Sequence, residues 1–364
     1  MLTDSDLDAA VESGLISRDI RSQLDAFALG RRGKSAPLAS AEASATPKIR
    51  FEPIHVLYYA GALLVIGAMG LFATAAFDAL GGWALTTIAL AYAVGFVWLG
   101  QRLWRDPQTR TPGGLSIAVA VSMAPLAIYG VQDALNLWAA DKPEGYRDFY
   151  PLINGSWIYM ELGAVAAAAL ALRFFPFPFI LAIAAVALWF FSMDLAALIA
   201  HRHVPDWNAD WELRRTVSVL VGLAMIAAAW TLDLKWAALG DFGFWLHLFG
   251  AMTLWGAITA GSGNEFGKAI YCLFNIAFIA LGLFLDRRVY AVFGTIGVAL
   301  YLGHLASVVF NSTVGFSFAL TVIGLVMILA AVQLERRRSA ITAYLEASLP
   351  ETLRALRPPH ARPA

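Results

Sequence analysis

The sequence has very little cysteine and little charge. Cys272 is the only cysteine among 364 residues, which excludes an internal disulfide and any metal site built on several thiolates. It lies in an apolar run, where a cysteine is ordinarily buried and unreactive. Charged residues make up 14% of the chain, against about 25% in a typical soluble domain. The formal net charge is zero, so no overall basic field favours nucleic acid, and we expect no nucleic-acid partner.

Several catalytic motifs are also missing. The chain has no P-loop and no H-E-x-x-H pattern, which excludes the nucleotide-driven motors and zinc proteases that carry those motifs. Gly261-Ser262-Gly263 lacks the G-x-S-x-G frame of a nucleophile elbow. The sequence therefore favours a protein that is not an enzyme, and it predicts no cofactor.

Hydrophobic residues, at 59%, dominate from residue 54 onward. Apolar runs of about twenty residues recur, each long enough to cross a hydrocarbon core of about 30 Å as a helix. We place them at residues 54–77, 83–104, 113–135, 156–175, 176–200, 214–234, 241–261, 266–285, 289–310 and 315–334, the third interrupted by Pro125. The sequence thus predicts an all-α polytopic membrane protein with about ten transmembrane helices.

The basic residues predict the orientation of these spans. With the N-terminus inside, 20 of the 26 Lys and Arg residues fall on the cytoplasmic side. The acidic start Met1–Asp6 lacks the basic and apolar regions of a signal peptide, so we expect the first span to direct insertion. Both termini are therefore predicted to be cytoplasmic.

The flanking segments complete the predicted domain organisation. Residues 1–29 read as a cytosolic two-helix segment, too short to bury a core alone, so residues 3–29 are expected to dock on the membrane domain, on a second copy or on a protein partner. Residues 30–50 read as a flexible linker and 51–334 as the transmembrane domain in the lipid bilayer. Residues 335–364 read as a cytosolic amphipathic helix and tail.

Four polar residues inside the predicted spans are candidates for an ion or proton site, because such residues are costly in a membrane. Glu161 and Asp194 lie on consecutive spans near their outer ends. His304, near the outer end of the ninth span, and Asn275, midway along the eighth, are expected to join them in one polar cavity. The alternative for each is a cap or a hydrogen bond to a neighbouring helix.

Two weaker patterns concern metals. The loop before the sixth span offers His201, His203 and Asp206 as metal ligands, although its spacing matches no zinc signature and polar loops are common at membrane surfaces. His55 and His247 both begin spans on the predicted cytoplasmic side, as two axial ligands of a haem would. The alternative is that both simply lie at the interface.

The order of these parts resembles predicted bacterial multi-pass membrane proteins grouped as domains of unknown function, which join a short cytosolic helical segment to a many-span domain. The matching features are the linker and the motifs Leu7-x3-Val11-x2-Gly14-Leu15-Ile16 and His55-Val56-Leu57-Tyr58-Tyr59-Ala60-Gly61-Ala62. The resemblance implies location in a bacterial inner membrane and carries over no functional residue.

Three functional hypotheses follow. The first is a small-solute or ion carrier that uses Glu161 and Asp194. The second is a membrane sensor or scaffold that signals through the N-terminal helices. The third is an intramembrane enzyme that depends on a metal or a haem.

Overall fold

The computed structural model describes residues 20, 53–76, 80–138, 155–200, 211–236, 240–260, 264–309, 313–337, 340, 344 and 356–358. The chain divides into two units, Met1–Val56 and Leu57–Ala364. The first unit contributes Ile20 and residues 53–56 to the described part, so the predicted helices of segment 3–29 and the linker lie outside it. Everything below concerns the second unit, apart from the first turn of α3.

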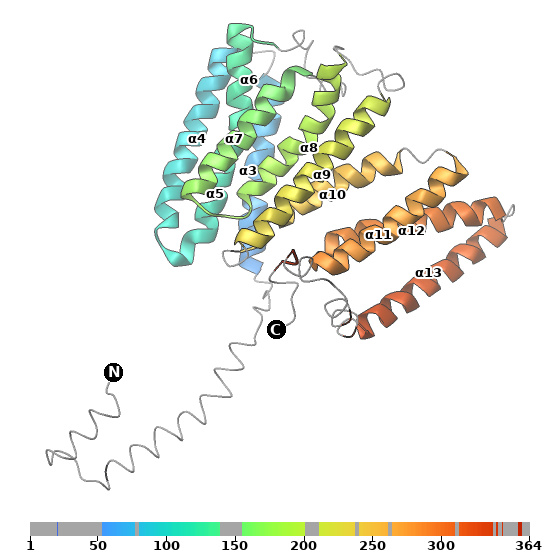
Figure 1. Ribbon diagram of the computed structural model, residues 1–364. Coiled ribbons are helices and arrows are strands. Elements are labelled where there is room, and N and C mark those ends of the chain that lie inside the picture. The colour runs from blue at the N-terminus through green and yellow to red at the C-terminus, as the bar shows by residue number, and fades with distance from the viewer. Residues whose placement is uncertain are drawn as a thin grey trace. The chain divides into compact units, whose positions relative to one another are not determined.

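All regular structure in the described part of the chain is helical (Figure 1). The elements are α3 (Pro53–Ala76), α4 (Gly82–Trp104), η1 (Pro107–Thr109), α5 (Arg110–Ser122), α6 (Ala124–Leu135), η3 (Gly155–Trp157), α7 (Ile158–Phe174), α8 (Ile180–Ile199), α9 (Trp211–Trp236), α10 (Phe244–Thr259), α11 (Glu265–Leu285), α12 (Arg288–Val309) and α13 (Thr313–Arg336). Each of the ten predicted ranges falls on one helix, or, for the third, on α5 and α6 together. The all-α prediction is confirmed.

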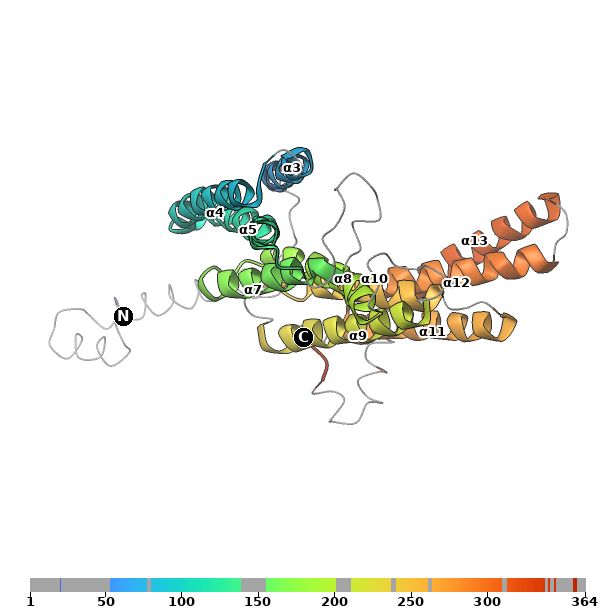
Figure 2. The same cartoon turned by 90° about the horizontal axis from the view of Figure 1, so that it is seen from above.

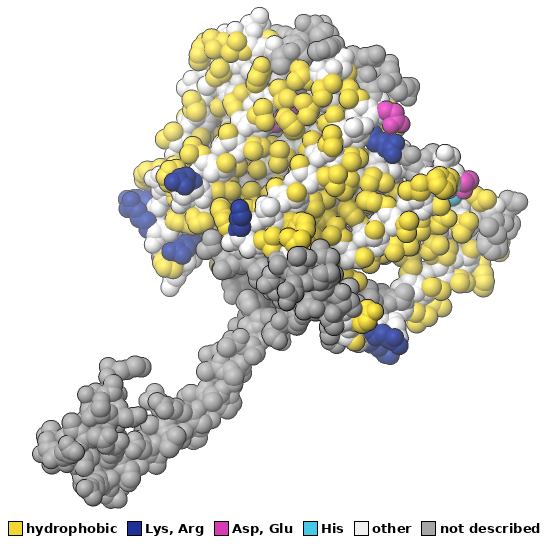
Figure 3. All heavy atoms as spheres, in the orientation of Figure 1, with side chains coloured by type: hydrophobic (Ala, Val, Ile, Leu, Met, Phe, Trp, Pro, Cys, Tyr) yellow, Lys and Arg dark blue, Asp and Glu magenta, His cyan; other side chains and the backbone are white. Residues whose placement is uncertain are grey.

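Within the residues that the structure describes, six helical segments are both long and apolar enough to cross a membrane, and three further apolar helices are shorter. Their outer surfaces are apolar as well: Leu64 is 74% exposed and Phe266 75% exposed. On the face drawn in Figure 3, hydrophobic side chains cover most of the described surface, and the charged ones are few and scattered. Such a surface suits lipid rather than water, so the chain is a multi-pass integral membrane protein.

The third predicted span is broken in its middle. α5 ends at Ser122 and α6 begins at Ala124, with Pro125 in the first turn of α6. Proline has no amide hydrogen to donate to the preceding turn, and its ring clashes with the carbonyl four residues back. The break that the sequence indicated is therefore present.

The helices pack mostly with their neighbours in the chain. α4 lies against α5 and α6, α7 against α8, and α9 against α10. Toward the C-terminal end, α11 lies beside α12, which also contacts α13 (Figure 2). The largest core cluster gathers side chains of α5 and α8 with Phe179, Met225 and Leu246.

A short piece near the C-terminus returns to the helices. The Trp230 indole donates to the carbonyl of Leu356 at 2.7 Å, and Arg357 Nε donates to the carbonyl of Phe284 at 3.2 Å. Arg357 is buried. Residues 356–358 therefore pack on α9 and α11, whereas most of the predicted C-terminal helix lies outside the described residues.

Candidate functional site

Glu161 and Asp194 are brought together by a short turn. α7 ends at Phe174 and α8 begins at Ile180, so the two helices run antiparallel and in contact. Glu161 lies 13 residues before the end of α7 and Asp194 14 residues after the start of α8. At 1.5 Å per residue, both lie about 20 Å from the turn. The sequence spacing alone thus places the two carboxyl groups at one level.

The two carboxyl groups are buried and adjacent. Glu161 is 7% exposed and Asp194 is 1% exposed. The groups lie close enough to interact electrostatically. Both oxygens of Glu161 are shielded from solvent, and within the described part of the chain no donor satisfies either of them with good geometry. This pair is the part of the predicted four-residue cluster that the structure assembles.

The pair lines a cavity of about 410 Å³. Its walls come from α3, the α5–α6 break, α7, α8 and the segments just before α7 and α8. Most lining side chains are apolar, among them Leu63, Ile66, Met160, Ile183 and Phe190. Among the described lining residues, Ser122 is the only other one with a side-chain oxygen, and its hydroxyl donates to the carbonyl of Val119 at 2.7 Å.

Asn275 and His304 lie elsewhere. On α11, Asn275 Oδ1 accepts from the Trp255 indole at 2.9 Å, and its amide nitrogen donates to the Tyr271 carbonyl at 2.7 Å. On α12, His304 Nε2 lies 3.2 Å from Glu265 Oε1 and 3.1 Å from Lys268 Nζ. Neither side chain lines the cavity of Glu161 and Asp194. The structure thus gives both residues the helix-to-helix contacts that were their alternative interpretation.

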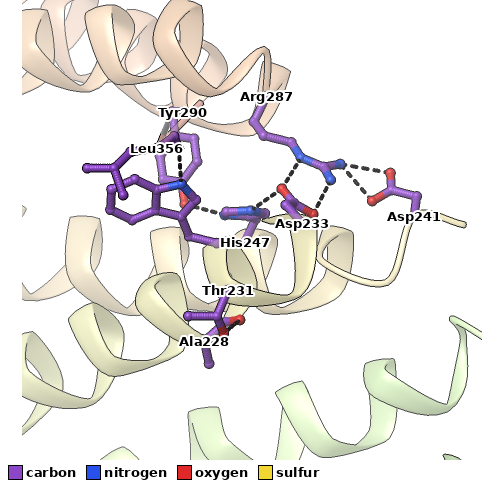
Figure 4. Close-up of polar contacts among 9 residues, drawn as sticks. Ala228, Thr231, Asp233, Asp241, His247, Arg287, Tyr290 and Leu356 are labelled. Atoms are coloured by element: carbon purple, nitrogen blue, oxygen red, sulfur yellow. Dashed lines mark hydrogen bonds and ion pairs between the residues drawn. The ribbon is translucent and has the colours of Figure 1, made fainter. Parts of the chain in front are cut away.

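His247 belongs to a second polar group that includes Asp233, Asp241, Arg287 and Tyr290 (Figure 4). His247 Nε2 lies 2.9 Å from Asp233 Oδ2, and its Nδ1 lies 2.6 Å from the Tyr290 hydroxyl. A carboxylate only accepts, so Nε2 carries the proton, and in the neutral ring Nδ1 accepts from the tyrosine.

Arg287 ties the rest of this group together. Its guanidinium donates to Asp233 at 2.5 and 3.0 Å and to both oxygens of Asp241 at 2.7 and 2.8 Å. Burial alone would lower the pKa of Arg287, but its hydrogen bonds to the two aspartates and their attraction outweigh burial and raise it above its usual range. The guanidinium therefore stays charged, and it fastens the end of α9 to the turn between α11 and α12.

These contacts bear on the two metal hypotheses. Both ring nitrogens of His247 are engaged, which leaves neither to bind a haem iron in this arrangement. The side chain of His55, and the loop residues His201, His203 and Asp206, lie outside the part that the structure describes. Within that part, no three His, Cys, Asp or Glu side chains gather as metal ligands would.

Sequence reasoning missed the group around Arg287. Arg287 entered it only as one of the 20 basic residues counted on the cytoplasmic side, and Asp233 was not among the candidate residues. One signal was available: Asp233 is an acidic residue inside an apolar run, three residues before the end of α9. Its partner is 54 positions away, and no local pattern predicts so distant a contact.

Comparisons of the chain with family models, with curated proteins and with solved structures return no match. No family is identified, so the resemblance to bacterial multi-pass membrane proteins stays a prediction. The functional argument rests on the geometry of the site alone.

Proposed function

We propose that this chain is a ten-span membrane carrier that couples the movement of a small solute to a proton held by Glu161 and Asp194. The observation that carries the proposal is the adjacency of these two buried carboxyl groups in one apolar cavity. Ionisable groups inside a membrane protein are expensive and usually mark a transport path or a proton relay.

The chemistry of the pair favours a proton. Two adjacent carboxyl groups in apolar surroundings cannot both be charged, so they share a proton unless a cation neutralises them. A hard metal ion such as Ca²⁺ or Mg²⁺ needs about six oxygen ligands. The described lining offers only the two carboxyl groups and Ser122, whose hydroxyl is already directed at a carbonyl. A proton needs no such shell.

The break between α5 and α6 supports a carrier as well. Ser122 and Pro125 both line the cavity, so the interrupted span forms part of its wall. The backbone of Met123, between the two helices, keeps a helical conformation, so the interruption is a proline-centred one rather than an unwound stretch. Proline in a membrane helix frees a carbonyl of the preceding turn, and such interruptions are common where a span lines a cavity. If both termini are inside, as the distribution of basic residues predicts, the carboxyl pair lies in the outer half of the membrane, where a solute would enter from outside.

Proton binding can be measured without knowing the solute. The full chain is reconstituted in liposomes on a solid-supported membrane, and the charge displaced by a pH jump is recorded. We expect the double variant Glu161→Gln/Asp194→Asn to displace about tenfold less charge than the wild type, because a proton can no longer enter the membrane at this site.

Glu212→Gln is the matched control, because this glutamate lies in the first turn of α9 with its side chain 78% exposed. It should leave the displaced charge unchanged. A wild-type signal from a correctly inserted double variant would rule out the carboxyl pair as the proton site.

A further inference from the structure

A second cavity of this chain runs between α4 and α7, and we call it the α4–α7 groove. Its lining comes from α4, α5, α6 and α7 with Met123 and Phe175, and its volume is about 680 Å³. Since α5 and α6 each pack against both α4 and α7, they form the floor of the groove. We propose that this groove binds one anionic phospholipid, with an acyl chain along the groove and the phosphate among arginines at one end.

The lining of the groove suits a hydrocarbon chain. Among the described lining residues, Gln101 is the only one with a polar side chain. Ala93 of α4 and Ala167 of α7 keep the two walls low. At the rim, Leu90 is 52% exposed and Leu170 is 64% exposed, so apolar side chains border the groove where it opens to the bilayer.

The length of the groove matches one leaflet. On α4 its lining extends from Ala89 to Gln101, twelve positions or about 18 Å at the helical rise. On α7 it extends from Gly163 to Phe174, eleven positions or about 17 Å. Half of a hydrocarbon core of about 30 Å is about 15 Å. An acyl chain lying in the groove would therefore reach from the membrane surface to the midplane.

Basic side chains gather at the end of the groove where α4 and α7 both end. Four exposed arginines lie there: Arg102 and Arg105 at the end of α4, Arg110 at the start of α5 and Arg173 in the last turn of α7. In the described part of the chain, no carboxylate forms an ion pair with any of the four. Their charge is thus available to a ligand, and basic pockets between membrane helices favour anionic lipid head groups.

Aromatic rings hold two of these arginines beside the groove. The Arg102 guanidinium lies 5.0 Å from the centre of the Trp98 ring, and that of Arg110 lies 6.0 Å from the centre of the Trp104 ring. Trp104 in turn packs edge-to-face on Phe175, a lining residue, at 5.8 Å between centroids. A guanidinium held in this way can donate two parallel hydrogen bonds to a phosphate.

The groove distinguishes this arginine cluster from an ordinary basic helix end. Basic residues at the ends of spans are common, because they set the orientation of a membrane protein. Arg336 and Arg337 at the end of α13 form such a pair, and neither lines the groove. The lipid site is therefore expected at the ends of α4 and α7 and not at the end of α13.

Competition for binding tests both halves of the proposed ligand. Radiolabelled dioleoyl phosphatidylglycerol is bound to the immobilised full chain in a neutral detergent and displaced by unlabelled competitors. Unlabelled phosphatidylglycerol should compete at least about tenfold better than dioleoyl phosphatidylcholine, which has the same chains and no net charge. Inorganic phosphate at the same concentrations should not compete, because it lacks the acyl chain. These comparisons use the wild type, so they stay valid if a variant fails to fold.

Paired arginine variants locate the head group. Arg102→Gln/Arg173→Gln should weaken phosphatidylglycerol binding at least about tenfold, because two of the phosphate's counter-charges are removed. Arg336→Gln/Arg337→Gln removes the same charge from another helix end and should leave the binding unchanged.

Paired alanine variants locate the acyl chain. Ala167→Phe places a ring in the groove and should weaken the binding severalfold while the arginines stay in place. Ala169→Phe is the matched control, because Ala169 is an exposed residue of the same helix that does not line the groove. It should leave the binding unchanged.

Equal competition by phosphatidylcholine, or an equal loss in the two arginine double variants, would overturn the inference. Displacement by inorganic phosphate as strong as that by lipid would also overturn it, since the arginines would then bind a free anion without the groove. The groove shares no described lining residue with the cavity of Glu161 and Asp194. The charge displaced by a pH jump therefore tests the proton site separately, and either proposal can fail alone.

Discussion

At the residue scale, two buried acidic residues of this chain differ in the charge of the groups beside them. Asp233 has Arg287 and His247 as partners, which compensate its charge with hydrogen bonds. Glu161 has another carboxyl group as its electrostatic neighbour. A carboxylate with cationic partners holds helices together, whereas Glu161, with both oxygens buried and a second carboxyl group beside it, favours a bound proton. This contrast is why we assign structure to Asp233 and transport to Glu161.

Replacing Asp233 should therefore destabilise the fold. Asp233→Ala leaves Arg287, whose side chain is 11% exposed, with Asp241 alone. Removing one partner of a buried ion pair costs about 3–5 kcal/mol, because the other charge stays buried without compensation. The change is measured as the shift in unfolding free energy of the purified chain in mixed micelles of increasing denaturing-detergent content.

Asp241→Asn is the matched control at the same arginine. The side chain of Asp241 is 55% exposed, and exposed ion pairs contribute about 1 kcal/mol or less. If Asp241→Asn destabilises the chain as much as Asp233→Ala does, Arg287 depends on both aspartates equally, and the central role given to Asp233 is wrong.

At the scale of elements, glycines decide how closely two helices approach. A Cβ atom on Gly250 of α10 would lie 2.9 Å from Cβ of Met225 and 3.2 Å from the carbonyl oxygen of Gly222, both on α9. A Cβ on Gly256, later in the same helix, would meet nothing within 4 Å. One glycine is thus required by packing and the other is not.

Alanine at these two positions should have opposite effects. Gly256→Ala should stabilise α10 by up to about 1 kcal/mol, because alanine is the better helix former. Gly250→Ala gains the same amount but forces α9 and α10 apart, and overpacking costs about 1–3 kcal/mol, so the net effect should be a loss. Thermal unfolding of both variants in one detergent measures the difference. Stabilisation by both would show that the two helices can separate at little cost.

The helices themselves could be predicted because a membrane allows few conformations for a long apolar segment. Apolar runs of about twenty residues admit few alternatives to a spanning helix, and Pro125 marks the break by its missing amide hydrogen. The adjacency of Glu161 and Asp194 was equally predictable from the short turn between α7 and α8. It needed only the rise per residue and the antiparallel direction of neighbouring helices.

Contacts between distant helices could not be derived in this way. Asn275 and His304 were grouped with Glu161 by depth in the membrane, but depth does not fix which helices are neighbours. α11 packs against α12, so the two side chains find partners there and on α10. The group around Arg287 likewise depends on which helices pack against one another. Its members are spread from α9 to α12, and only the packed structure brings them together.

At the scale of the whole molecule, the distribution of basic residues predicts an orientation in the membrane. If the chain has ten spans and both termini are inside, Gln108 and Arg337 lie in the cytoplasm and Leu137 and Asn264 lie outside. All four side chains are exposed and lie at or beyond helix ends. Each position therefore reports the side of the membrane on which its helix ends.

Single cysteines at these positions test the orientation after Cys272→Ala removes the native thiol. In intact cells that express the chain, a membrane-impermeant maleimide should label Leu137→Cys and Asn264→Cys, and it should label Gln108→Cys and Arg337→Cys only after permeabilisation. The reverse labelling pattern would show that the protein has the opposite orientation in the membrane, with Glu161 and Asp194 nearer the cytoplasm. Labelling of Leu137→Cys and Gln108→Cys from the same side would mean that α5 and α6 form a re-entrant pair, so the break at Pro125 would be a reversal of the chain and the span count would be odd.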